Sequence, residues 1–410
     1  MSDLHVWLDG AHIATLTEER GRMRLVHTRD ARPAGAPLVS VAMPVGVAPY
    51  TDARVRPFFQ GLLPEGPARA MIAHDLGFAA DDDFGLLGAL GRDCAGALVV
   101  LPAGQAPPSR PTSPPTVLDD AEIERRLRAL PTDPLGVTDS VRASLPGVQP
   151  KLLLSRFGDA WCEPDLGRPS THLLKPAIAD LRRSVDNEAF CLALATRAGL
   201  HAATTTTARF GPLHVLVSER YDRFVDSDAT WWRVHQEDAC QALSIPTGSP
   251  RMKYEAYGGP SLRAIAQLLR RWGADPRELL EVLTFHVLVG NADAHGKNIS
   301  LLHAPDGRIT LAPLYDVMCT AIYDGSDGGR RVDTSAAMTV NGRSDIRTIS
   351  VDDLVAEARG WQLRSGAART AIERVVERVA AAIEPTLAEL GPTVPDELVT
   401  YIADRVRSLR

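Results

Sequence analysis

The sequence contains few cysteines and arranges them without a recognisable pattern. Its five thiols, Cys94, Cys162, Cys191, Cys240 and Cys319, form no Cys-x-x-Cys pair, and their number is odd. A disulfide framework or a zinc site normally requires paired or closely spaced cysteines. The pattern therefore argues against both and favours a reducing compartment.

Long apolar segments are also missing. No uninterrupted apolar run approaches the ~20 residues that a membrane-spanning helix requires. The first ten residues, MSDLHVWLDG, lack the charged region and apolar core of a secretory signal. We therefore expect a cytoplasmic protein.

Basic charge is not in excess, since 45 Lys and Arg residues stand against 51 Asp and Glu residues, for a net charge of -6. This balance argues against a protein built mainly to coat nucleic acid or an anionic membrane. The chain has 410 residues, 45% hydrophobic and 23% charged, which is enough for two or three globular domains.

The pattern of apolar residues divides the chain into four segments. Residues 1–102 are predicted to form a small α+β domain, and residues 103–139 a proline-rich linker with a short helix over 119–130. Residues 140–225 are predicted to form a strand-rich lobe, and residues 226–410 a helical lobe. Because protein kinases have this order of lobes, the sequence predicts an α+β, two-lobed, protein-kinase-like fold.

Individual elements follow from the periodicity of the apolar residues. The N-terminal domain is expected to contain a hairpin over 4–16 with its turn at Asp9 and Gly10, helices over 55–63 and 68–76, and a strand over 97–101. The strand-rich lobe is expected to contain a three-stranded meander over 148–156, 160–163 and 171–175, a helix over 184–198, and a strand pair ending at 213–220. The helical lobe is expected to contain helices over 262–272, 277–289 and 367–383.

The segment after the predicted helix 277–289 carries the strongest chemical signal. Asp293 is followed five residues later by Asn298, and Asp316 lies just past a short predicted strand over 308–311. The kinase catalytic loop has the same interval, in which Asp accepts the substrate proton and Asn binds magnesium. Carboxylate and amide oxygens suit Mg²⁺, so we expect a catalytic Asp293 and a metal held by Asn298 and Asp316. Asp, Asn and Gly are also turn residues, and a simple loop is the alternative.

Lys175 ends a predicted strand of otherwise apolar residues. A lysine in this position can point into a cleft and pair with the α- and β-phosphates of ATP. Glu188, on the next predicted helix, can hold it as the lysine–glutamate pair does in kinases. A single lysine at a strand end is more often solvated, which is the alternative interpretation.

Three weaker signals come from polar segments. The loop 144–151, SLPGVQPK, has backbone amides that can cup phosphate oxygens. It contains one glycine and matches neither a Walker A loop nor the kinase glycine-rich loop, so an ordinary turn is the alternative. The segment 218–222, SERYD, lies where a hinge would offer backbone groups and an aromatic ring to adenine. The cluster 235–238, HQED, is expected to orient a loop or cap a helix.

Many short motifs of this chain occur together in one known family. They are, in order, LHVWLDG, IATLT, FFQGLLPEGP, GRDCAGAL, SLPGVQPK, THLLKP, SVDNEAFCLALA, SERYDR, HQEDACQAL, KYEAYGGP, GNADAHGKN and APLYDV. The chain thereby resembles HipA, the kinase toxin of bacterial HipBA toxin–antitoxin modules, over nearly its whole length. So many motifs in one order are far more specific than any of them alone.

The resemblance implies an ATP- and magnesium-dependent serine/threonine kinase whose small N-terminal subdomain is fused to the two lobes. The implied roles are catalysis for Asp293, magnesium binding for Asn298 and Asp316, ATP binding for Lys175, Glu219, Tyr221, Val148, His295 and Lys297, support for Glu188, Gln149 and Lys151, and autophosphorylation for Ser144. A phosphoserine carries about -1.5 to -2 charges, so modification of Ser144 is expected to disfavour the ATP-binding loop and switch the kinase off. Pro146 and Pro150 restrict this loop and are a departure from the family pattern.

Targets and partners are also implied by the resemblance. The family's target resembles an aminoacyl-tRNA synthetase, typically glutamyl-tRNA synthetase, and its phosphorylation arrests translation and growth. The expected partner is a HipB-like helix-turn-helix antitoxin that brings the kinase to operator DNA. The acidic net charge fits this arrangement, because tight DNA binding requires clustered Lys and Arg. Two other functions stay open: a small-molecule or lipid phosphotransferase, and a DNA-bound corepressor scaffold with negligible catalysis.

Overall fold

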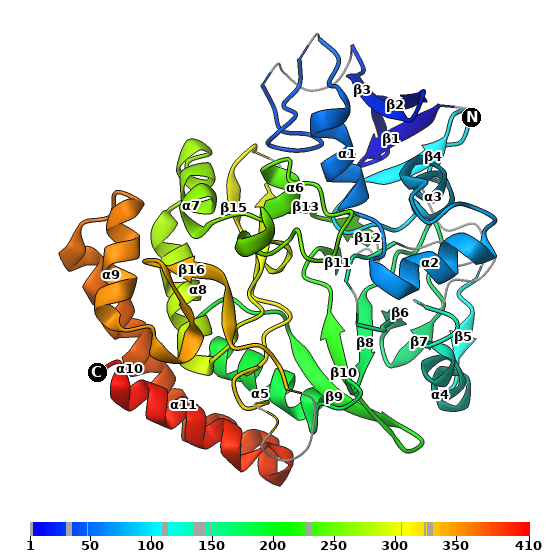
Figure 1. Cartoon of the computed structure of the whole chain (residues 1–410). Helices are drawn as coiled ribbons and strands as arrows, with labels where there is room; N and C mark the ends of the chain where they lie inside the picture. Colours follow the sequence, from blue (N-terminus) through cyan, green and yellow to red (C-terminus); the bar gives the residue numbers. More distant parts are fainter. Residues whose placement is uncertain are drawn as a thin grey trace.

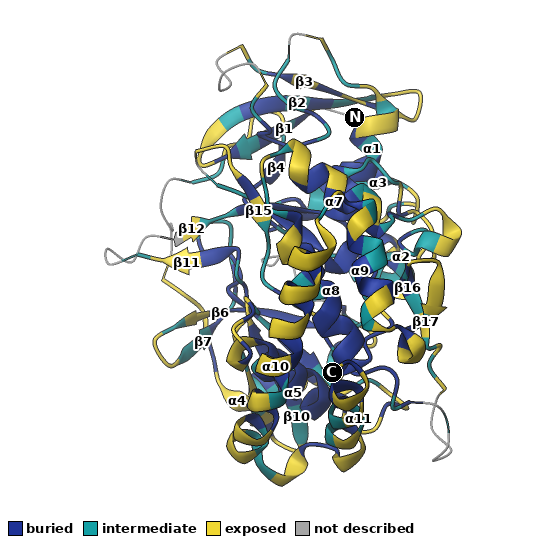
Figure 2. Ribbon diagram, turned by 90° about the vertical axis from the view of Figure 1, so that its left-hand side faces the viewer, coloured by how far each residue is buried: buried dark blue, intermediate teal, exposed yellow. Residues whose placement is uncertain are grey.

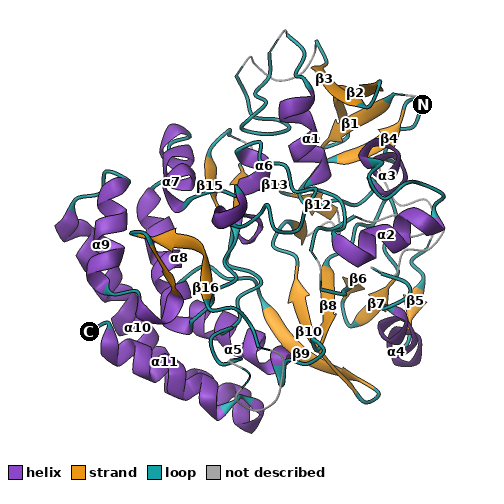
Figure 3. Cartoon of the chain, viewed as in Figure 1, coloured by secondary structure: helices purple, strands orange, loops and turns teal. Residues whose placement is uncertain are grey.

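The computed structural model describes most of the chain. The described residues are 3–29, 35–46, 48–108, 114–134, 144–147, 149–226, 231–304, 306–323, 325 and 331–410. Within them, the N-terminal domain, the strand-rich lobe and the helical lobe lie around a common centre, with strands gathered on one side and long helices on the other (Figures 1 and 3). No helix among these residues is long and apolar enough to cross a membrane.

The N-terminal domain combines a four-stranded antiparallel sheet with three helices that share its apolar core. Its elements are β1 (Leu4–Leu8), β2 (Ala11–Glu19), β3 (Arg22–His27), α1 (Asp52–Gln60), α2 (Gly66–Asp75), α3 (Asp83–Leu90) and β4 (Val99–Pro102). The strand order is β3-β2-β1-β4. The predicted β1–β2 hairpin is confirmed, and its turn residues Asp9 and Gly10 have φ angles of 49° and 76°. Such left-handed pairs are typical of tight hairpin turns.

The strand-rich lobe is built on a six-stranded antiparallel sheet. Its elements are β5 (Val117–Leu118), α4 (Asp120–Ala129), β6 (Leu152–Phe157), β7 (Ala160–Cys162), β8 (His172–Pro176), α5 (Ser184–Arg197), β9 (Thr205–Phe210) and β10 (Leu213–Glu219). The order β5-β7-β6-β8-β10-β9 places β6 between β7 and β8. The predicted meander, in which each strand pairs with the next, is therefore wrong. The first four residues of β6 are buried, as suits a strand with neighbours on both sides.

The two faces of this sheet are covered by different helices. Val217 of β10 belongs to the apolar cluster that contains Ile123 of α4. Its neighbour Leu216 instead packs with Val185 of α5. Because successive side chains of a strand point to opposite faces, α4 and α5 lie on opposite sides of the sheet. The helix predicted within the linker thus packs onto the strand-rich lobe.

The helical lobe surrounds α8, whose residues 283–289 are all buried (Figure 2). Its helices are α6 (Ala239–Ala242), α7 (Leu262–Arg271), α8 (Pro276–Val289), α9 (Val351–Gly360), α10 (Ser365–Leu390) and α11 (Asp396–Ser408). Its short strands are β11 (Arg223–Val225), β12 (Trp231–Arg233), β13 (His235–Asp238), β14 (Ser300–His303), β15 (Ile309–Leu311), β16 (Ser335–Val340) and β17 (Arg343–Asp345). The three predicted helices are confirmed, although α10 extends seven residues beyond its predicted end at residue 383 because Thr386 continues its buried face.

Candidate active site

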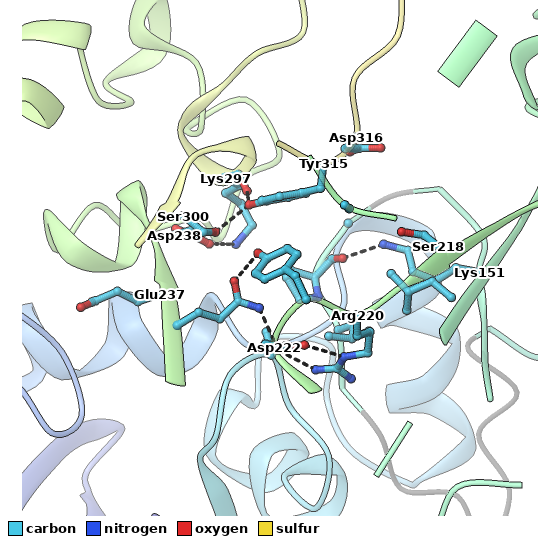
Figure 4. A pocket seen from close by; sticks show the side chains of 18 of the residues that line it. Lys151, Ser218, Arg220, Asp222, Glu237, Asp238, Lys297, Ser300, Tyr315 and Asp316 are labelled. Carbon is cyan, nitrogen blue, oxygen red and sulfur yellow. Dashed lines mark hydrogen bonds and ion pairs between the residues drawn. The ribbon is translucent and has the colours of Figure 1, made fainter. Parts of the chain in front are cut away.

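A cavity lies where the N-terminal domain and the two lobes meet (Figure 4). It encloses about 940 Å³ that no atom fills, including space open to solvent. All three parts of the molecule contribute lining residues, among them Glu65, Lys175, Tyr221, Lys297 and Asp316.

Lys175 of β8 makes two ion pairs at this cavity. Its Nζ lies 2.7 Å from Glu188 Oε1 and 2.9 Å from Asp316 Oδ1. Burial alone would lower the pKa of Lys175, but the carboxylates of Asp316 and Glu188 outweigh burial and raise it. Lys175 is therefore charged at neutral pH. Its contact with Glu188 is the one that the lysine–glutamate prediction requires.

Asp316 brings a carboxylate from the helical lobe to an amine 141 residues away in the sequence. Its φ angle of 57° lies in the left-handed region, which residues with side chains adopt mainly where the surroundings impose it, often at functional sites. The positive charge of Lys175 lowers the pKa of Asp316, although the surrounding protein atoms act in the opposite direction. The side chain is 46% exposed, so the carboxylate still faces the cavity while it pairs with Lys175.

Asp293 is held in a tight loop directly after α8. The helix ends at Gly290, whose φ angle is 68°. Asn291 Oδ1 accepts a hydrogen bond from Asp293 N, and Asn298 Nδ2 donates one to Asp293 O, both at 3.0 Å. The Tyr254 hydroxyl donates to Asp293 Oδ1 at 2.5 Å. The backbone and the carboxylate of Asp293 are therefore oriented by separate partners.

The surroundings of Asp293 are rich in acidic charge. Crowding by protein atoms raises the pKa of Asp293, the Tyr254 hydrogen bond opposes this rise, and the charge of Asp316 adds to it. Water still reaches the carboxylate, because Asp293 is exposed. Asp293 and Asp316 thus interact electrostatically across the site.

The oxygen atoms near Asp316 fit a hard divalent cation. Asp316 offers a partly exposed carboxylate, and the amide oxygen of Asn298 accepts no hydrogen bond from any described residue. Within the described part of the chain, no group of three His, Cys, Asp or Glu side chains forms a complete metal site. An ion here would need oxygens from its ligand, as magnesium does in nucleotide sites.

The end of β10 supplies an aromatic wall to the cavity. The ring of Tyr221 lies against that of Tyr315, with a centroid distance of 5.6 Å. The Tyr221 hydroxyl donates to Gln236 Oε1. Glu219 also lines the cavity and is exposed. Two aromatic rings therefore lie side by side at the cavity, since Tyr221 and Tyr315 both line it.

Buried ion pairs connect this wall to the N-terminal domain. Arg220 Nη2 lies 2.9 Å from Asp222 Oδ2, on either side of Tyr221. Arg223 Nη2 lies 3.0 Å from Asp93 Oδ1, which belongs to the N-terminal domain. The four side chains are almost fully buried. The position of Tyr221 therefore depends on a domain far from it in the sequence.

Ser144 is fully buried in this conformation. Its hydroxyl donates to Leu62 O at 2.7 Å, and its backbone N donates to Asp93 O at 2.9 Å. A kinase can modify this hydroxyl only after the loop has moved outward. Val148, in the same loop, lies outside the described residues.

The end of the loop places a second amine near the cavity. Lys151 Nζ donates to Pro146 O at 2.8 Å. Burial, followed by the positive charge of Lys175, lowers the pKa of Lys151 to about 8. Gln149 donates to Pro176 O at 3.3 Å and so joins the loop to β8.

Lys297 and His295 have different surroundings. Lys297 lines the cavity, and its Nζ contacts Asp238 Oδ2 at 2.7 Å and Gly61 O at 3.1 Å. His295 does not line the cavity and packs edge-on against Tyr254, with ring centroids 5.2 Å apart. Burial lowers the pKa of His295, so its ring is neutral at neutral pH. The structure brings Lys297, but not His295, to the cavity wall.

Asp238 caps α6 through a reciprocal bond with Gln241, so the helix-cap prediction for the HQED cluster is confirmed. Glu65, Tyr254 and Tyr315 are neighbours of the site that the sequence did not single out. They lie in the motifs FFQGLLPEGP, KYEAYGGP and APLYDV. The sequence signal for these residues was that each one lies inside a motif shared with the family.

Two family models match the chain and together span most of it. The model of the HipA N-terminal domain matches residues 4–101, and that of the HipA-like C-terminal domain matches residues 143–384. The second match alone covers more than half of the 410 residues. The chain belongs to the HipA family. The predicted family is thus confirmed.

Individual relatives agree with this assignment. A putative kinase of Sinorhizobium fredii is 36% identical, over 97% of this chain and 93% of that protein. The serine/threonine-protein kinase toxin HipA of Shewanella oneidensis is 28% identical, over 90% of this chain and 86% of that protein. The solved complex of Shewanella oneidensis HipA with HipB and operator DNA has a TM-score of 0.85 and 26% identity, covering 99% of this chain and 97% of the matched one. The predicted α+β, kinase-like fold and the enzyme class, a protein kinase, are confirmed.

Proposed function

We propose that this HipA-family chain transfers the γ-phosphoryl group of ATP to a serine or threonine of a protein. One observation carries the proposal: the Lys175 amine bridges Glu188 and Asp316 at a cavity shared by both lobes. Phosphoryl transfer needs positioned phosphates, a metal and a carboxylate near the attacking hydroxyl, and the residue types present supply each. ATP and magnesium are part of this proposal.

Each residue has a specific task in this scheme. Lys175, held by Glu188, binds the α- and β-phosphates, and the ring of Tyr221 supports adenine. Asp316 and Asn298 hold magnesium, which when bound neutralises charge on the phosphates. Asp293 accepts the proton of the attacking hydroxyl, with its carboxylate oriented by the Tyr254 hydrogen bond. Backbone amides of the loop that contains Ser144 and Lys151 bind phosphate oxygens.

The proposed biological role follows the family. The target is a translation protein, an aminoacyl-tRNA synthetase such as glutamyl-tRNA synthetase, and its modification arrests growth and favours persistence. A HipB-like antitoxin is the proposed partner, supported by the solved Shewanella oneidensis HipA–HipB–operator DNA complex. The same complex favours a second, non-exclusive role, in which the chain acts as a corepressor bound to DNA through the antitoxin. Autophosphorylation of Ser144 is the proposed off-switch.

Label transfer from γ-labelled ATP tests the proposal. Purified chain is incubated with a lysate that lacks the antitoxin, and the labelled products are identified by mass spectrometry. We expect phosphoserine or phosphothreonine in a translation protein and in Ser144, and loss of both with Asp293→Asn. Labelled metabolites without a labelled protein would instead support a small-molecule phosphotransferase.

A further inference from the structure

One carboxylate of the N-terminal domain reaches the cavity without a role in the scheme above. Glu65 precedes α2, is 7% exposed, and lines the cavity. Neither of its carboxylate oxygens has a hydrogen-bond partner among the described residues. A buried carboxylate without such partners is costly unless nearby charge or a ligand compensates it.

The nearest compensation comes from two lysines of the helical lobe. Glu65 Oε2 lies 3.6 Å from Lys253 Nζ, and Oε1 lies 3.7 Å from Lys297 Nζ. Lys297 has a closer partner in Asp238, at 2.7 Å. Lys253 has no other ion pair among the described residues, although its side chain is only 10% exposed. Besides Glu65, its ammonium group contacts the ring of Tyr254, 5.8 Å from the ring centroid, so no carboxylate holds it at hydrogen-bond distance.

Glu65 connects the cavity to the catalytic loop. Glu65 lines the cavity, whereas its partner Lys253 does not. The negative charge of Glu65 contributes to the raised pKa of Asp293, whereas the positive charge of Lys253 lowers that pKa. Glu65 and Lys253 therefore both act electrostatically on Asp293, with opposite sign.

The backbone before Glu65 is fixed, so the carboxylate has a defined place. Gly61 O accepts a hydrogen bond from Lys297, and a Cβ on Gly61 would lie 2.7 Å from the side chain of Gln241. Leu62 O accepts the bond from Ser144. This close contact with both lobes means that the N-terminal domain forms part of the wall of the active site.

We propose that Glu65 is a positioning residue that acts as a charge gate between the nucleotide and Asp293. In the nucleotide-free kinase, its carboxylate holds Lys253 and repels the γ-phosphate. When ATP binds productively, the γ-phosphate replaces Glu65 as the partner of Lys253. The gate rests on the proposed function, since it assumes that ATP occupies the cavity with its γ-phosphate toward Asp293.

The gate predicts a specific effect on nucleotide selectivity. ATP carries one more negatively charged phosphate than ADP, and only this phosphate meets Glu65. Like charges placed together at a binding site disfavour binding. Glu65→Gln removes the repulsion between residue 65 and the γ-phosphate, and it releases Lys253. We expect Glu65→Gln to tighten ATP binding at least about tenfold and ADP binding by less than about threefold, where tenfold corresponds to about 1.4 kcal/mol.

Isothermal titration of the full chain with ATP and ADP, each with magnesium and with EDTA, tests the gate. Asp75→Asn is the matched control, because Asp75 is an exposed carboxylate at the other end of α2. The control should bind both nucleotides like wild type. The double variant Glu65→Gln, Lys253→Met should lose the increase in ATP affinity, because the released lysine is the source of that increase. Lys253→Met alone should weaken the binding of ATP more than the binding of ADP. This variant keeps the test informative if Glu65→Gln misfolds.

Two results would overturn the gate alone. Equal changes in ATP and ADP affinity, or none, would mean that Glu65 has only a structural role. If Glu65→Gln bound ATP more weakly than wild type in the presence of magnesium but not in EDTA, Glu65 would be a metal ligand instead. A wild-type chain that bound neither nucleotide would contradict the proposed function and the gate together.

Discussion

Asp93 offers a sharp test of how the N-terminal domain is coupled to the kinase lobes. It accepts hydrogen bonds from Ser170 N at 2.8 Å and Ser170 Oγ at 2.6 Å, and from Arg223 Nη2 at 3.0 Å. Arg220 and Arg233 lie at 3.7 and 3.8 Å. We consider the substitution Asp93→Asn, which preserves size and removes the charge.

The expected magnitude follows from the charges that remain. The buried cluster contains three arginines and two carboxylates, those of Asp93 and Asp222, so its net charge rises from +1 to +2 in the variant. Breaking a buried ion pair by removing one partner costs about 3–5 kcal/mol, because the other charge is left uncompensated. We therefore expect the free energy of unfolding to fall by about 3–5 kcal/mol.

Denaturant unfolding followed by tryptophan fluorescence and circular dichroism measures this change. Asp159→Asn is the control, since Asp159 is fully exposed and pairs with Arg156 only at 3.7 Å. The control should stay within about 0.5 kcal/mol of wild type. A loss of less than about 1 kcal/mol for Asp93→Asn would refute the reasoning, because such a value is typical of an exposed pair.

The pH dependence of stability gives an independent check on Asp93. Burial alone would raise the pKa of Asp93, but Arg220, Arg223 and Arg233 outweigh burial and lower it. A carboxyl group with a lowered pKa stabilises the fold above its unfolded pKa, about 3.9, and this stabilisation is lost as the pH falls further. The difference between wild type and Asp93→Asn should thus be largest near neutral pH and shrink below about pH 4.

Three other residues give separate predictions. Because the pKa of Lys151 is about 8 in the empty cavity, ATP titrations should show affinity falling as the pH rises through this value, and Lys151→Gln should remove that dependence. Gly290→Ala should lower the unfolding free energy by more than about 1–2 kcal/mol in denaturant titrations, since its φ is positive and a Cβ would lie 2.5 Å from the Tyr401 ring. Ser144→Ala should cost about 1 kcal/mol in the same assay through loss of the bond to Leu62 O, and an unchanged stability would contradict the buried position of Ser144.

Local patterns in the sequence predicted many elements because their causes are local. The apolar spacing of α8 and α10 and the turn at Asp9 and Gly10 depend on neighbouring residues, and all are found in the structure. The pairing order of the strand-rich sheet depends on contacts between distant segments. The position of β6 between β7 and β8 was therefore missed. The strand β3 was also missed, although it pairs locally with β2 and its buried residues alternate with exposed ones.

The site shows the same division between local and distant causes. The Asp293-to-Asn298 interval is visible in the sequence because a single loop contains it. The contact of Lys175 with Asp316 spans 141 residues, and no local pattern in the sequence predicts it. Nothing near Glu65 in the sequence indicates that it reaches Lys253, because that contact arises from how the N-terminal domain packs on the helical lobe.

A crystal structure with a non-hydrolysable ATP analogue and Mn²⁺ tests the central claim most directly, because anomalous scattering locates the ion. We expect the ion to contact the Asp316 carboxylate and the Asn298 amide oxygen, with the γ-phosphate directed toward Asp293 and the adenine beside Tyr221. An ion bound away from Asp316, or a nucleotide bound outside this cavity, would contradict the account.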